Sequence, residues 1–109
     1  MTQQEIQEGK TFAIVAYITF IGLIVAIIKN LNQKNPFTAF HVRQMIGLVL
    51  LLIFSNLTEK YVNSWLGTIL WFGTFAFWVY GLITAVRGET KLIPFFGKLF
   101  QEWFQNIGK

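Results

Sequence analysis

The residues best suited to chemistry are grouped at one place in the chain, in residues 40–44 (FHVRQ). The segment holds the single histidine of the sequence, His41, together with Arg43 and Gln44. An imidazole has an ordinary pKa of about 6.5, so His41 could sense protons or contact a ligand. His41 and Gln44 are three residues apart and share a helix face, whereas Arg43 points elsewhere. The alternative is that all three side chains anchor a helix end by binding lipid head groups or backbone carbonyls.

Other kinds of chemistry find little support in the sequence. A chain without cysteine has no thiolate nucleophile, disulfide or thiolate metal site. One histidine without neighbouring carboxylates cannot complete a metal shell. The glutamates lie at the termini and in loops, and there is no phosphate-binding glycine loop and no nucleophile with a base at a recognisable spacing. We therefore predict no catalytic residue, no cofactor and no metal, and we do not expect an enzyme.

The composition is that of a membrane protein. Apolar residues make up 54% of the chain and charged residues 13%, against about 25% charged residues in soluble domains. The formal charge of +4 does not indicate nucleic-acid binding, because the basic residues stand at the ends of apolar segments and no recognition motif accompanies them. Basic residues so placed set the orientation of a chain in the membrane and contact anionic lipids. Membrane lipids are thus the first expected partners.

Three apolar segments predict three transmembrane helices, at about residues 12–28, 40–58 and 64–86. Residues 11–28 and 61–86 carry no charge and are long enough to cross about 30 Å of hydrocarbon. The middle segment is short unless its helix begins near Pro36, which would place Arg43 a turn or two inside the helix. The fold expected for residues 1–109 is a single all-α integral membrane domain.

The segment after Arg87 predicts an amphipathic helix at about residues 93–107 rather than a fourth span. Lys98 and Glu102 interrupt its apolar run, and the large apolar side chains fall on one side of a helical wheel. We expect this face to lie at the membrane interface or against the other helices of the chain, or alternatively against a partner protein. Its main contacts would come from Phe96, Phe100, Trp103 and Phe104.

The distribution of basic residues predicts an orientation. They are concentrated in the first loop and in the tail, and are sparse elsewhere: Lys29, Lys34, Arg43, Arg87, Lys91, Lys98 and Lys109, against Lys10 and Lys60. With three spans, the positive-inside rule places the N-terminus outside and the C-terminus in the cytoplasm.

Small residues recur at spacings that let helices approach closely in lipid. They are Ala16, Gly22 and Ala26 in the first apolar segment, and Gly81, Ala85 and Gly88 in the third. Such stripes serve either packing within the chain or self-association.

Four segments together resemble a known family. They are residues 9–17 (GKTFAIVAY), 35–44 (NPFTAFHVRQ), 81–88 (GLITAVRG) and 92–98 (LIPFFGK). These residues resemble the small bacterial Tic-type import-component proteins, distant relatives of a chloroplast inner-envelope translocon subunit that are largely grouped as a domain of unknown function. The resemblance covers roughly residues 9–107, and its most specific part is the Phe-His-x-Arg-Gln segment.

The resemblance implies a noncatalytic component of the bacterial inner membrane that is related to protein-import components, without a specific role, because bacterial relatives mostly have no assigned activity. Plastid members are assigned to a protein-conducting channel and have four spans, whereas the fourth segment here is short and amphipathic. His41, Arg43, Gln44 and the turn at 88–94 are the positions carried over. We expect a subunit that assembles with other membrane proteins or with itself. The alternatives are a small-solute channel or transporter formed by self-association, and a lipid-binding, membrane-organising protein.

Overall fold

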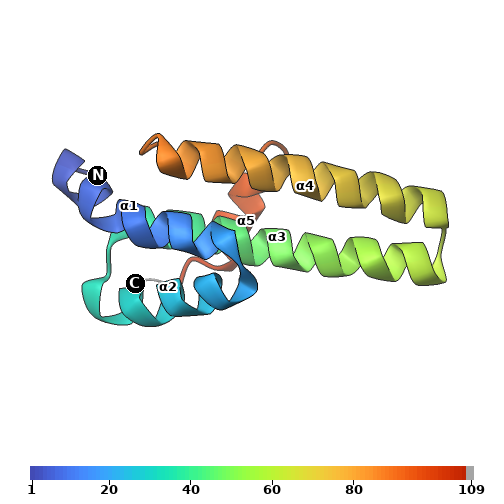
Figure 1. Ribbon diagram of the computed structural model, residues 1–109, viewed down its shortest axis with the longest axis horizontal. Coiled ribbons are helices and arrows are strands. Elements are labelled where there is room, and N and C mark those ends of the chain that lie inside the picture. Colours follow the sequence, from blue (N-terminus) through green and yellow to red (C-terminus); the bar gives the residue numbers. More distant parts are fainter. Residues whose placement is uncertain (108–109) are drawn as a thin grey trace.

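The computed structural model describes residues 1–107, which fold into α-helices without a β-strand and confirm the expected all-α class. α1 (Gln3–Ile18) and α2 (Phe20–Gln33) form one antiparallel hairpin, and α3 (Pro36–Tyr61) and α4 (Ser64–Val86) form a longer one (Figure 1). The short α5 (Gly97–Trp103) packs against α3. α3 and α4 continue well beyond the tip of the α1–α2 hairpin, so that hairpin covers only part of their length.

α3 and α4 are long and apolar enough to cross a membrane, and they contain the predicted spans 40–58 and 64–86. They have 26 and 23 residues, and at 1.5 Å per residue they measure about 39 and 35 Å, more than the hydrocarbon thickness of about 30 Å. α3 begins at Pro36 because the Asn35 side chain caps it, accepting hydrogen bonds from the backbone N–H groups of Phe37 (2.9 Å) and Thr38 (3.1 Å). Arg43 therefore lies inside the helix.

The first predicted span is not a single helix. Residues 12–28 are divided at Thr19, whose backbone is extended and whose hydroxyl caps α2 by accepting a hydrogen bond from Gly22 N (2.9 Å). A Cβ at Gly22 would collide with the carbonyl oxygen of Val15, so a glycine is needed where α2 turns back against α1. At 1.5 Å per residue, α1 and α2 are about 24 and 21 Å long, too short to cross the hydrocarbon. The prediction of a continuous helix over 12–28 is wrong. Within residues 1–107, two helices rather than the predicted three are long and apolar enough to span a membrane.

The helix near the C-terminus is shorter than the predicted 93–107. Phe95 has a left-handed backbone (φ 71°), and turns on both sides confine the helix to Gly97–Trp103. Phe100 is only 3% exposed, and its ring lies against Gly47 so closely that a Cβ there would collide with it. The apolar side of this segment thus packs on α3 at Phe100, while Trp103 is 64% exposed. Lys109, counted with the basic tail, lies outside the described residues.

Candidate functional site

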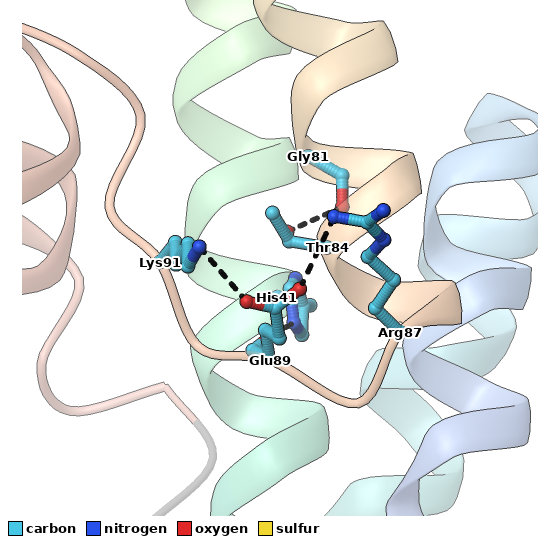
Figure 2. A network of polar contacts seen from close by, with 6 residues as sticks. All are labelled: His41, Gly81, Thr84, Arg87, Glu89 and Lys91. Carbon is cyan, nitrogen blue, oxygen red and sulfur yellow. Dashed lines mark hydrogen bonds and ion pairs between the residues drawn. The ribbon is translucent and has the colours of Figure 1, made fainter.

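His41 is completely buried at the junction of α1, α3 and the linker after α4. Its Nδ1 lies 2.7 Å from the Tyr17 hydroxyl, and its Nε2 lies 2.8 Å from the carbonyl oxygen of Glu89 (Figure 2). Because a carbonyl only accepts, we assign the ring proton to Nε2, which leaves Nδ1 to accept the proton of the Tyr17 hydroxyl. The geometry thus fits a neutral imidazole that joins two other segments to α3.

Gln44 extends this contact one helical turn along α3. Its Nε2 donates to the Tyr17 hydroxyl (3.4 Å), and its Oε1 accepts from the backbone N–H of Ile93 (2.8 Å). The hydrogen bonds form one directed chain, from Ile93 N–H through Gln44, Tyr17 and His41 to the Glu89 carbonyl. We call Tyr17, His41 and Gln44, with these two backbone groups, the His41 cluster. It fastens α1 and the linker at residues 89–93 to α3.

Aromatic rings enclose the His41 imidazole. Phe37 and Phe40 lie with their ring centroids 4.8 and 5.1 Å from it, both in edge-on geometry. Above the cluster, the Glu89 carboxylate lies 3.0 Å from Lys91 Nζ and 3.9 Å from the Arg87 guanidinium (Figure 2). The Lys91 and Arg87 side chains are 58% and 69% exposed, so solvent screens these ion pairs and they contribute little to stability.

Arg43 is directed to the C-terminal segment instead of the His41 cluster. Its guanidinium donates to the carbonyl oxygens of Ile107 (3.0 Å) and Gln105 (3.1 Å) and to the Gln101 side chain (3.3 Å). Gln101 in turn donates to the Phe40 carbonyl (2.9 Å). Of the two expectations for this arginine, lipid head groups or backbone carbonyls, its described contacts match the carbonyls. Arg43 holds the segment at residues 101–107 against the start of α3.

A second polar junction, not predicted from the sequence, joins α1 to the turn between α2 and α3. Asn35 donates from its side chain to the Glu5 carbonyl (2.8 Å), and its backbone N–H donates to the Asn30 side chain (2.8 Å). Thr38 donates to the carbonyl of Gly9 (2.9 Å), and a side chain at Gly9 would collide with Asn35. The Asn-Pro pair at 35–36 signals a helix start, but the distant backbone partners carry no sequence signature.

The predicted packing residues lie at contacts within the chain. All of them are buried or half-buried: Ala16, Gly22, Ala26, Gly81, Ala85 and Gly88. Gly81 faces the Tyr17 ring, and Gly88, which has a left-handed backbone (φ 74°), faces Ile6. Of the predicted interface aromatics, Phe100 is buried, Phe104 is half-buried, and Phe96 and Trp103 are exposed.

The contacts of these residues give the site a structural character. Within residues 1–107, every buried polar side-chain atom has a hydrogen-bond partner, and no three His, Asp or Glu side chains are grouped as metal ligands would be. These hydrogen bonds hold α1, α2, α3, α5 and the linker at residues 89–93 together. A buried polar network whose groups all have partners is rigid. No family model matches the chain, and neither a curated protein nor a solved structure matches it significantly.

Proposed function

We propose that the chain is a noncatalytic integral protein of the bacterial plasma membrane and works as a subunit of a membrane complex, with other proteins or with copies of itself. The observation that carries this proposal is the contrast between the polar and the large apolar side chains. The polar groups at the helix junctions bind one another, whereas large apolar side chains on α3 and α4 stay exposed: Ile53, Phe54, Leu57, Trp65, Ile69 and Phe72. Such an exposed apolar surface is suited to lipid and to neighbouring transmembrane helices.

We propose a complex that handles other proteins at the membrane, because the sequence resembles import components. The alternative, a small-solute channel formed by self-association, has less support. Two polar side chains of α3 and α4 donate to carbonyls of their own helix: Ser55 to Leu52 (2.9 Å) and Thr74 to Leu70 (2.8 Å). A water-filled pathway needs polar groups that face it, so the subunit role is preferred.

The proposal includes a revised orientation, with both termini in the cytoplasm. If only α3 and α4 cross the membrane, α1 and α2 form a hairpin that enters from one side and returns to it. Lys60 is the one basic residue between positions 44 and 86, and it lies beside the α3–α4 turn. This arrangement puts all other basic residues on one side, which agrees with the positive-inside rule better than three spans do.

Single-cysteine labelling tests this orientation, since the natural chain has no cysteine. We expect a membrane-impermeant maleimide added to intact cells to label Val62→Cys, a position 74% exposed at the α3–α4 turn. Gln3→Cys and Gln33→Cys, both at exposed positions, should react only after the membrane is permeabilised. Labelling of Gln3→Cys in intact cells would instead support three spans with the N-terminus outside.

Purification tests the subunit role. A tagged copy expressed at its native level and extracted in mild detergent should be recovered with a near-stoichiometric membrane partner, or as a defined oligomer. Mass spectrometry of the intact complex gives the composition and ratio, and an unrelated two-span protein with the same tag serves as the control. Recovery of a monomer without a reproducible partner would overturn the proposal.

A further inference from the structure

The α1–α2 hairpin ends partway along α3 and α4 (Figure 1), and a pocket lies at its tip. The pocket has a volume of about 310 Å³. Three helices line it, with main contributions from Tyr17, Ile18, Leu48, Leu52, Phe75 and Trp78. We call it the tip pocket.

Most residues that line the tip pocket are apolar, and several of its few polar groups are occupied by hydrogen bonds within the chain. Three of its polar groups are already engaged: Trp78 Nε1 donates to the Tyr17 carbonyl (2.7 Å), the Tyr17 hydroxyl donates to His41, and the Thr74 hydroxyl donates to its own helix. The pocket opens to the surface of the molecule, and a lining with so few free polar groups disfavours polar occupants. Its occupant should therefore be hydrocarbon.

The size and depth of the tip pocket narrow the choice further. A helix with side chains is 10–12 Å across, so one 5.4 Å turn of it fills roughly 420 to 610 Å³, more than the pocket holds. The lining residues of α3 and α4, among them Leu48 and Phe75, lie near the middle of those helices. In a bilayer this depth belongs to the lipid tails. A thin, flexible hydrocarbon chain fits both the volume of the pocket and its depth in the bilayer, whereas one turn of a partner helix exceeds the volume.

We infer that the tip pocket binds one acyl chain of a membrane phospholipid, wedged between α3 and α4 beneath the end of α1. The inference rests on the proposed membrane location. The bound chain would fill the space left by a hairpin too short to span the bilayer, and would make that lipid part of the folded structure.

Two matched variants test the inference. Ile18 lines the pocket and Ile53 does not, and both are exposed, at 60% and 50%. We expect the unmodified protein, purified from phosphatidylglycerol-containing membranes into mild detergent, to retain one phospholipid in native mass spectrometry. Ile18→Phe should lower lipid affinity about tenfold by obstructing the pocket, while Ile53→Phe should retain the lipid. Thr74→Phe obstructs the pocket from α4 and should have the same effect as Ile18→Phe.

Vesicles with brominated acyl chains separate failure of this inference from failure of the proposed membrane location. Bromine quenches tryptophan, and in a variant whose only tryptophan is Trp78, quenching reports contact with lipid tails. Without quenching in any variant, the chain does not enter the bilayer and the proposed function fails. Quenching together with equal lipid retention by Ile18→Phe and Ile53→Phe, or with no retained lipid in the unmodified protein, would overturn the tip pocket alone.

Discussion

Replacing Gly22 with alanine is expected to lower the free energy of unfolding by about 3 kcal/mol, at the upper end of the usual cost of overpacking. The new Cβ would collide with the Val15 carbonyl oxygen, a backbone atom that cannot rotate away as a side chain can. Relief of the collision requires α2 to move from α1, which also disturbs the Trp78 contact to the Tyr17 carbonyl. Unfolding in mixed detergent micelles, followed by circular dichroism, measures the change.

Gly73 provides the matched control, because a Cβ there meets nothing within 4 Å. Gly73→Ala should leave stability unchanged or raise it by up to about 1 kcal/mol, since alanine is the better helix former. Equal destabilisation of the two variants would contradict the close approach of α1 and α2 at Thr19.

Replacing His41 with alanine is the second change expected to have a large effect, again about 3 kcal/mol, because it leaves a cavity and deprives buried partners of their hydrogen bonds. The partners are the Tyr17 hydroxyl and the Glu89 carbonyl. Residues 89–93 should loosen at the same time, and hydrogen exchange of the Ile93 amide measures this local release. Tyr17→Phe leaves no comparable cavity but deprives His41 Nδ1 and Gln44 Nε2 of their shared partner, and should cost about 2 kcal/mol.

The control for the His41 variant is Thr68→Ala, because the hydroxyl of the half-buried Thr68 donates to Ser64 in its own helix and to no other segment. Its effect on stability should be close to zero. If His41 merely anchored the helix end in lipid head groups, His41→Ala would match this control, and the amide of Ile93 would exchange no faster.

The long helices could be predicted from the sequence because the signal for them is local and continuous. Between residues 61 and 86 neither a charge nor a proline interrupts the apolar run, and α4 occupies most of it. The run from 11 to 28 is equally uncharged, yet an uncharged run does not specify that the chain continues in one direction. The reversal depends on Thr19 as a cap and on Gly22 as a point of close approach, two ordinary residues whose joint effect appears only when the helices meet.

The candidate site shows the same limit. His41 and Gln44 were expected to share a helix face, and both point into one hydrogen-bonded cluster. Their other partners are backbone groups at Glu89 and Ile93, which every residue type carries and which therefore leave no trace in the sequence. Arg43 likewise binds carbonyls near the end of the chain. The sequence therefore identified the polar residues of the site, but it could not identify the backbone groups that they bind.

The short α1–α2 hairpin also makes the molecule unequal across the bilayer. In the proposed orientation, α1 and α2 accompany α3 and α4 through the cytoplasmic leaflet, while only α3 and α4 continue into the outer one. The protein then displaces more lipid from the inner leaflet than from the outer, like a wedge. A membrane that bulges toward the cytoplasm accommodates such a shape at the least elastic cost, so in this orientation the hairpin would give the protein a preference for curvature.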